Sequence, residues 1–293
     1  QLGVLSRKRQ WQDGQPGNIF NTKTPVVNAF QKSLPFKLTA AQQKVLQELL
    51  ADLEKPRPMS RLLQGEVGSG KTVVATIALL VATANGYQGA FMAPTEILAE
   101  QHFSNICHLL SRAGQEEVAE DYLHSHSGLL PRIVTVALLI GDIKGARKLE
   151  LQQLISDGDI DIVIGTHALI QKGVDFHRLG LAVVDEQHRF GVTQRSSLRQ
   201  KGFSPHILGM TATPIPRTLA LTLYGDLDLS VIDELPPGRQ VIKTKWLKPA
   251  QRESAYAFLR RQVTAGYQAF IICPLVEESE AIQARAAIVE YER

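Results

Sequence analysis

The chain has 293 residues, of which 44% are hydrophobic and 21% are charged, and its formal net charge is +3 at pH 7. This composition is typical of a globular protein with one large domain or two smaller ones. The slight basic excess is compatible with a phosphate-rich partner such as nucleic acid, but many unrelated proteins share it, so charge alone excludes little.

The sequence excludes two classes of protein: those that span a membrane and those that are held together by disulfide bonds. No stretch approaches the ~20 uninterrupted apolar residues of a membrane span, and the N-terminus lacks the apolar core of a signal peptide. Only two cysteines occur, Cys107 and Cys273. Neither has a second Cys or a His at metal-ligand spacing, so the sequence indicates neither a disulfide framework nor a zinc site. We therefore expect a cytoplasmic protein in a reducing compartment, without a membrane partner.

Residues 1–35 differ from the rest of the chain in composition and in the lack of a periodic pattern of apolar residues. They begin with the basic cluster Arg7-Lys8-Arg9, which by itself is usually a solvated face, and continue into a stretch rich in Gly, Pro, Asn and Gln with little periodicity. This pattern predicts a linker.

From Leu38 onward, short apolar runs alternate with helical patterns. The predicted buried strands are 59–64, 89–93, 133–140, 161–164, 181–184 and 206–210. Apolar strands separated by helices are typical of a parallel sheet that is covered on both faces. We therefore predict a doubly wound α/β fold. Segment 113–131, which separates two of these units, is interpreted as a surface excursion without an assigned function.

The segment Leu-Pro-Pro-Gly-Arg at 235–239 interrupts the α/β pattern. One more strand, helix and strand are predicted after it, at 241–247, 250–264 and 268–274. So short a segment cannot close an α/β domain, and we expect it to be the beginning of a second one.

A phosphate-binding loop is predicted at Gly65 to Thr72, where GEVGSGKT matches G-x-x-x-x-G-K-[ST] between an apolar strand and a helical run. Glycines allow close approach of backbone N–H donors to phosphate, and the helix N-terminus adds partial positive charge. We expect Lys71 to neutralise the β- and γ-phosphates and the Thr72 hydroxyl to bind Mg²⁺. ATP and Mg²⁺ are thus the predicted cofactors. The alternative is a chance glycine-rich turn. The predicted nucleotide-binding residues are Gly65, Gly68, Ser69, Gly70, Lys71 and Thr72.

An acidic box follows the predicted strand 181–184, with the sequence Asp185-Glu186-Gln187-His188. Two carboxylates then lie at the carboxyl end of a strand, where α/β sheets bind ligands. We expect Asp185 to hold Mg²⁺ and Glu186 to orient and deprotonate the water that attacks the γ-phosphate. A solvated acidic turn is the alternative. His188 is either a structural histidine or a relay of the nucleotide state to the next loop.

Three further loops carry hydroxyl groups after predicted strands. The segment TATPIPRT at 211–218 can hydrogen-bond both to His188 and to a nucleic-acid backbone, although alone it reads as a turn with two prolines. The segments APTE at 93–96 and GTHAL at 165–169 can line one edge of the sheet and bind phosphates of a single nucleic-acid strand. The predicted coupling or DNA-contact residues here are Thr95, Thr166, His188, Thr211 and Thr213.

In order, the segments GEVGSGKT, APTEILAEQH, GTHALI, DEQHRFG and TATPIPRT resemble the helicase motifs of superfamily two. The segments DEQHRFGVTQR, TATPIPRTLALTLYGDLDLSVIDELPPGR and ICPLVEESE resemble, more specifically, the RecG family of branch-migration helicases. The resemblance covers roughly residues 35 to 280.

That resemblance implies a domain organisation and two further site residues. Residues 36–236 would form a RecA-like ATP-binding domain, 237–293 the start of a second RecA-like lobe, and 1–35 the linker from an N-terminal wedge domain. Gln42 in FKLTAAQ would read the adenine edge with its paired donor and acceptor, although in isolation it is a polar residue near a helix start. Arg217 would belong to the third helicase motif, near DNA or the domain interface.

The resemblance also implies a function: an ATP-dependent DNA helicase motor, monomeric and nucleoid-associated, that remodels replication forks and Holliday junctions in recombination and repair. The second lobe would carry an arginine finger worth about 10³-fold or more in rate, so we expect the chain alone to hydrolyse ATP weakly.

Two alternatives to this function stay open. An RNA helicase or chromatin-type translocase would share every catalytic residue. A nucleotide-dependent switch would close onto a protein partner without translocation.

Overall fold

The computed structural model describes residues 16–186, 197–198, 200–213, 227–234 and 243–272. The chain divides into two compact units, 1–239 and 240–293. The predicted residues His188 and Arg217 lie outside the described residues, as does Cys273. None of the described helices is both long and apolar enough to cross a membrane.

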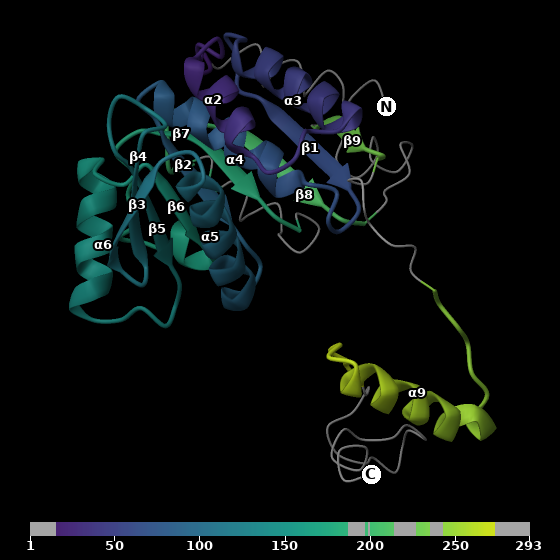
Figure 1. The fold of residues 1–293 in the computed structure, drawn as a ribbon. Coiled ribbons are helices and arrows are strands. Elements are labelled where there is room, and N and C mark those ends of the chain that lie inside the picture. Colours follow the sequence, from purple (N-terminus) through teal and green to yellow (C-terminus); the bar gives the residue numbers. More distant parts are fainter. Residues whose placement is uncertain (1–15, 187–196, 199, 214–226, 235–242, 273–293) are drawn as a thin grey trace, which may run out of the picture. The chain divides into compact units, whose positions relative to one another are not determined.

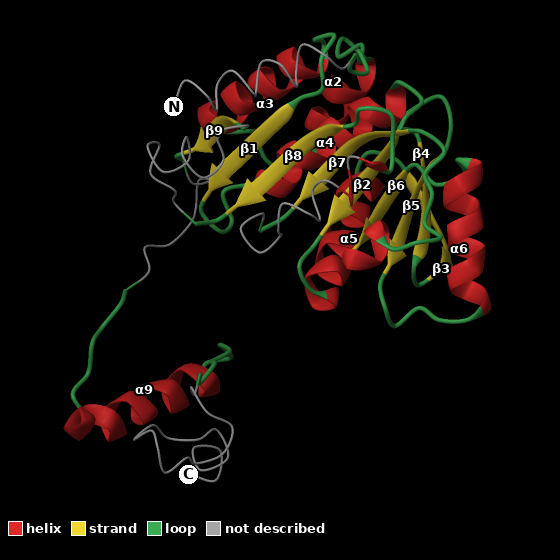
Figure 2. Ribbon diagram, turned by 180° about the vertical axis from the view of Figure 1, so that it is seen from behind, coloured by secondary structure: helices red, strands yellow, loops and turns green. Residues whose placement is uncertain are grey.

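A nine-stranded sheet in the order β3-β4-β5-β6-β2-β7-β8-β1-β9 organises the described part of the first unit (Figures 1 and 2). From β5 to β9 all neighbouring strands are parallel, whereas β3, β4 and β5 pair antiparallel. The strands are β1 (Ser60–Gly65), β2 (Gln88–Met92), β3 (Gln115–Glu120), β4 (Leu123–Ser127), β5 (Val134–Leu139), β6 (Ile162–Gly165), β7 (Leu179–Val184), β8 (His206–Thr211) and β9 (Asp228–Ile232). The predicted parallel sheet is confirmed.

Helices cover both faces of this sheet. Along β2 the side chain of Phe91 joins one core cluster, with α2, α3, α4 and α5, while its neighbours Ala90 and Met92 join the other, with α6. Within the continuously described range 16–186, the helices are α2 (Pro25–Ser33), α3 (Ala40–Leu53), α4 (Lys71–Ala84), α5 (Glu96–Ser111) and α6 (Ala146–Asp157), with a short 3₁₀ turn η1 (His167–Ile170). The fold is therefore the doubly wound α/β arrangement that the apolar runs predict.

Helix α4 lies at the centre of one layer. Every residue from Val73 to Thr83 is buried, so the helix is apolar all round and has no solvent face. Such a helix is stable only inside a protein core. Because α4 begins at Lys71, its burial fixes the position of the phosphate loop.

The structure departs from the sequence prediction in two regions of the first unit. Within 1–35, residues 25–33 form helix α2, which buries Val26, Val27 and Phe30, so this part is packed rather than an extended linker. Within the predicted excursion 113–131, β3 and β4 form an antiparallel hairpin that extends the sheet.

In the second unit, helix α9 (Arg252–Thr264) follows a 3₁₀ turn, η3 (Pro249–Gln251), close to the predicted helix at 250–264. The described parts of the predicted strands 241–247 and 268–274 do not form strands. A helix satisfies its own backbone hydrogen bonds, whereas a strand requires a neighbouring strand.

One buried histidine ties the start of β8 to the segment before α2. His206 is fully buried; its Nδ1 accepts a hydrogen bond from the Met59 N–H at 2.9 Å, and its Nε2 lies 2.7 Å from the Asn18 carbonyl oxygen. Because Nδ1 accepts, the proton is on Nε2 and the ring is neutral. Burial lowers the pKa of His206 from 6.5 to about 4.

We predict that this histidine makes the stability of the first unit depend on pH. Because its pKa is lower in the folded state, the unfolded chain gains the proton first as pH falls below 6.5, and stability is lost down to the folded pKa of about 4. Between pH 7 and pH 5 the loss from this group is about 2 kcal/mol. Urea unfolding of the wild type and His206→Asn at both pH values measures it. The variant, although less stable at pH 7, should lose about that much less, and an equal loss in both proteins would contradict the assignment.

Candidate nucleotide-binding site

The sheet order places five predicted loops side by side at one edge. The adjacent strands β6, β2, β7, β8 and β1 run parallel, so their carboxyl ends point the same way. At these ends Thr166 follows β6, Thr95 lies beyond β2, Asp185 follows β7, Thr211 ends β8 and Gly65 ends β1. Ligands of α/β sheets bind at this edge.

The phosphate loop turns from β1 into α4 through two glycines in the left-handed region, with φ of +80° at Gly68 and +87° at Gly70. Glycine adopts this conformation without steric cost. At Gly70 a side chain is excluded for a second reason, because an added Cβ would lie 2.3 Å from the Gln42 Nε2. The loop conformation therefore depends on these glycines.

Lys71 is folded back onto the loop that contains it. Its Nζ donates hydrogen bonds to the carbonyl oxygens of Gly65, at 2.7 Å, and Glu66, at 3.0 Å. Burial lowers the pKa of Lys71, and the nearby carboxylates of Asp185 and Glu186 partly oppose this by favouring the charged form. The phosphate loop and the acidic box, 113 residues apart in sequence at their nearest ends, thus act electrostatically on one another.

The acidic box begins where β7 ends. Asp185 is 8% exposed, and its backbone N–H donates to the Met92 carbonyl of β2 at 2.8 Å. Glu186 has φ +46°, a left-handed conformation that is strained for a residue with a side chain. Strain of this kind, of order 1–3 kcal/mol, clusters at functional sites. Here it lies at the residue that the sequence predicts to be the general base.

His102, on α5, is a site residue that the sequence prediction missed. Its Nε2 lies 2.8 Å from Asp185 Oδ2, and its ring packs on Phe91 with the centroids 4.5 Å apart. Its Nδ1 is buried and has no hydrogen-bond partner among the described residues. The tautomer with the proton on Nε2 leaves only a lone pair unpaired, so we assign His102 as a donor to Asp185.

Gln42 connects helix α3 to the phosphate loop. It is 1% exposed; its Oε1 accepts from the Thr39 N–H at 2.9 Å, which completes a capping box, and its Nε2 donates to the Ser69 carbonyl at 2.7 Å. The amide is therefore bonded to the protein at both ends, and an adenine-reading role for Gln42 stays a prediction. The Ser69 Oγ is buried without a hydrogen-bond partner among the described residues, and Thr72 is half-buried in the first turn of α4.

The threonines of the other loops fall into two groups, one exposed to solvent and one buried. Thr95 is exposed and caps α5, accepting from the Leu98 N–H at 3.3 Å, and Thr213 is exposed. Thr166 and Thr211 are buried, and the Thr211 Oγ1 accepts from the Thr213 N–H at 3.2 Å. Thr211 therefore shapes the turn after β8, while Thr95 and Thr213 are the two accessible to a partner.

Substitution of Gly70 by alanine is expected to weaken ATP binding through its contact with Gln42. Gly86 is the matched control, because it has φ +76° but no atom within 4 Å of an added Cβ. Both variants should lose about 1–2 kcal/mol of stability from the left-handed conformation. Only Gly70→Ala should also weaken binding of a fluorescent ATP analogue, by at least about tenfold, which corresponds to 1.4 kcal/mol. Equal weakening in both variants would show that the Gln42 contact is irrelevant.

We predict that His102 orients Asp185 for Mg²⁺. Loss of a group that orients a metal ligand typically costs about 10- to 100-fold in metal affinity. His102→Ala should therefore raise the Mg²⁺ concentration needed for half-maximal ATP-analogue binding by about tenfold, and His102→Gln, which keeps a donor, should recover part of it. His108→Ala on the same helix serves as the control. An unchanged Mg²⁺ requirement in His102→Ala would refute the orienting role.

Comparison with known proteins identifies the family. Residues 39–222 match the family described as DEAD/DEAH box helicase. The chain is 49% identical to the ATP-dependent DNA helicase RecG of Synechocystis sp. over 99% of its own length and 33% of that protein. It is 51% identical to RecG of Bacillus subtilis over 89% of its own length and 36% of that protein. The chain thus spans about a third of the length of these relatives.

Solved structures show the same relationship. A RecG bound to a three-way DNA junction superposes with a TM-score of 0.76 at 41% identity, covering 94% of this chain and 35% of that one. The DNA-bound helicase MrfA superposes with a TM-score of 0.51 at 17% identity, over 74% of this chain and 31% of that one, which shows the shared fold alone. Since the matched residues 39–222 make up more than half of the 293 and include both the phosphate loop and the acidic box, the chain belongs to the DEAD/DEAH box helicase family.

Proposed function

We propose that this chain is the ATP-binding motor domain of a DNA helicase or translocase that remodels branched DNA, such as replication forks and Holliday junctions, in recombination and repair. The observation that carries the proposal is the line of five loops on adjacent parallel strands, with Lys71 in the field of both carboxylates of the acidic box. The phosphate loop and the acidic box lie on this line, and so do the exposed residues Thr95 and Thr213.

The residues of the site take separate roles in this proposal. Lys71 exchanges its bonds to the loop carbonyls for the β- and γ-phosphates of ATP, and the N-terminus of α4 adds partial positive charge. Glu186 orients the attacking water and accepts its proton. Glu186 directly follows Asp185, whose carboxylate lies 2.8 Å from His102 Nε2. Thr95 and Thr213 contact the DNA backbone.

ATP and Mg²⁺ are the proposed cofactors. The Thr72 hydroxyl and the Asp185 carboxylate are oxygen donors of the kind that Mg²⁺ prefers, and His102 holds one carboxylate oxygen in place, so the donor set fits the ion. When bound, Mg²⁺ supplies positive charge that neutralises the phosphates. The proposed protein is monomeric, cytoplasmic and associated with the nucleoid.

The relatives support DNA as the polymer. The two proteins compared above are named ATP-dependent DNA helicases, and the superposed RecG is bound to a three-way DNA junction. In the whole protein, ATP would bind between two RecA-like lobes and draw them together, and hydrolysis would release them, moving the motor along duplex DNA. An arginine finger from the second lobe would supply about 10³-fold or more in rate.

Nucleotide binding and turnover test this proposal separately. The purified chain should bind ATP·Mg²⁺ and lose that binding in Lys71→Ala but not in Lys44→Ala, an exposed lysine on α3. It should show little DNA-stimulated hydrolysis, because the second lobe contributes to the rate. In the whole protein, Glu186→Gln should lower DNA-stimulated ATP turnover by about 10²-fold or more while ATP binding remains.

Stimulation of ATP turnover in the whole protein also tests which polymer it acts on and whether it is a motor or a switch. A three-way DNA junction should stimulate turnover more than linear duplex DNA or RNA. Stronger stimulation by RNA would favour an RNA helicase. No stimulation by either polymer, together with normal cellular function of Glu186→Gln, would favour a nucleotide-dependent switch.

A further inference from the structure

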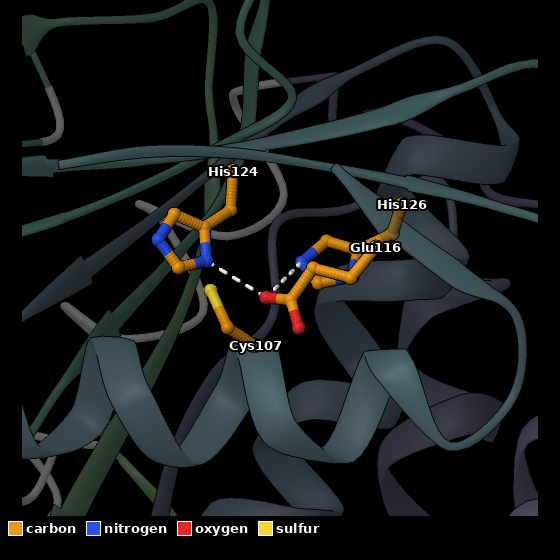
Figure 3. A group of neighbouring side chains, drawn as sticks. All are labelled: Cys107, Glu116, His124 and His126. Atoms are coloured by element: carbon orange, nitrogen blue, oxygen red, sulfur yellow. Dashed lines mark hydrogen bonds and ion pairs between the residues drawn. The ribbon is translucent and has the colours of Figure 1, made fainter. Parts of the chain in front are cut away.

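Four potential metal ligands gather at the antiparallel end of the sheet, outside the nucleotide site. They are Cys107 of α5, Glu116 of β3, and His124 and His126 of β4, and their ligand atoms all lie within 4.8 Å of one another. Figure 3 shows the thiol and the carboxylate facing the two imidazole rings. We call these four residues the CEHH cluster.

Strand pairing explains how these residues meet. His124 and His126 are two residues apart on β4, so they point to the same face of the sheet. Glu116 lies directly opposite His126 across the β3–β4 ladder, and Val118 lies opposite His124. Cys107 and Phe103 of α5 belong to the core on this face, and the Phe103 ring packs edge-on against His124 with the centroids 4.8 Å apart.

One member of the cluster lacks the bonds that its burial requires. His126 is fully buried, and neither of its ring nitrogens has a hydrogen-bond partner among the described residues. Its Nε2 lies 3.9 Å from Glu116 Oε1, too far for a hydrogen bond, whereas His124 Nδ1 lies 2.7 Å from the same oxygen. An imidazole that is buried without a partner is costly and calls for a further partner such as an ion.

We propose that Cys107, Glu116, His124 and His126 bind one Zn²⁺ ion. Sulfur and imidazole nitrogen are the ligands that Zn²⁺ prefers, whereas Mg²⁺ and Ca²⁺ prefer oxygen alone. One thiolate and one carboxylate balance the charge of the ion, so the partly buried site is neutral. On binding, the Cys107 thiol releases its proton to solvent, and the His124 proton moves to Nε2, which frees Nδ1 as a ligand.

The charge states without metal agree with this chemistry. Burial, together with the nearby carboxylate of Glu116, raises the pKa of the Cys107 thiol to about 12, so the group is a neutral thiol. Burial lowers the pKa of His126, which keeps its ring neutral and its lone pair available. Without metal, the Glu116 carboxylate is thus the single charged group of the cluster, and a divalent cation can convert the neutral thiol to a thiolate on binding.

Small side-chain movements complete the coordination. With bonds of about 2.0–2.1 Å to nitrogen and oxygen and about 2.3 Å to sulfur, tetrahedral ligands lie about 3.3–3.6 Å apart. The widest separation in the cluster must therefore shrink by about 1 Å, and the 2.7 Å contact between His124 and Glu116 must open by somewhat less. A surface cavity of about 710 Å³, lined by Cys107, Glu116 and His124 among others, provides an entry path.

All four positions of such an ion are filled by protein, which is typical of structural rather than catalytic zinc. The ion would join the β3–β4 hairpin to α5. About three turns of helix separate Cys107 from the Thr95 cap, and His102 with its bond to Asp185 lies between them. Zinc would therefore stabilise the helix that supports the acidic box.

Metal content and cobalt spectroscopy test the proposal on the purified chain. After removal of metal with a chelator, the protein should take up one Zn²⁺ per chain and unfold at a higher temperature. Co²⁺ should give the visible absorption of a tetrahedral site and a near-ultraviolet sulfur-to-cobalt band. Cys107→Ser should abolish that band, and His126→Ala should weaken Zn²⁺ binding by more than about a hundredfold, beyond the usual loss of an outer-shell partner.

Two control variants change residues of the same chemistry that are not among the four of the CEHH cluster. Cys273→Ser removes the other cysteine, and His108→Ala removes the histidine next to Cys107, so both should keep the zinc content and the cobalt spectrum. Cys107→Ser is nearly isosteric, which guards against misfolding as an explanation. No bound zinc in the wild type, a cobalt spectrum without the sulfur band, or zinc affinity unchanged by Cys107→Ser would each overturn the proposal.

Discussion

The parallel register of the central strands is the constraint on which the site depends. Gln64 of β1 pairs with Thr211 of β8, Val184 of β7 pairs with Met92 of β2, and Met92 pairs in turn with Gly165 of β6. The loops therefore leave the sheet at nearly one level, and a shift of one residue would turn every buried side chain of a strand to the wrong face. The burial of α4 on all sides then holds the phosphate loop at this level.

Helix α5 gives the site a second support. Its N-cap residue, Thr95, lies at the carboxyl ends of the parallel strands, where ligands bind. His102, seven residues further along the helix, donates a hydrogen bond to the Asp185 carboxylate. Without that donor a carboxylate that is 8% exposed would lose one of its few polar partners. The acidic box is thus contacted by a residue from a different motif, and this short contact joins helix α5 to the loop after β7.

Sequence reasoning predicted the parts of the molecule that depend on local pattern. Continuous apolar runs predicted the central strands, and the phosphate loop is recognisable because its glycines have a local geometric cause. The β3–β4 hairpin was not predicted because its strands, QEEVAE and LHSHS, lack a clean apolar alternation and are stabilised by pairing with β5. Pro25 at the first turn of α2 was the signal for a helix inside a segment whose composition otherwise indicates a linker.

His102 lies on the buried stripe of α5 with Ala99 and Ile106, but its partner Asp185 is 83 residues away in the sequence, so only the fold reveals the pair. The CEHH cluster is likewise invisible to spacing rules, because it combines a helix residue with two strands.

The polar sequence of β3 affects whether two copies of this chain can pair through their sheets. Among the described strands β3 forms one end of the sheet, where a row of backbone N–H and C=O groups faces outward. Such an edge readily pairs with another chain unless charge opposes it. Glu117 and Glu120 lie on this strand, so a second copy that paired alongside would bring like charges together. The acidic strand β3 therefore opposes edge-to-edge pairing at this end of the mixed sheet.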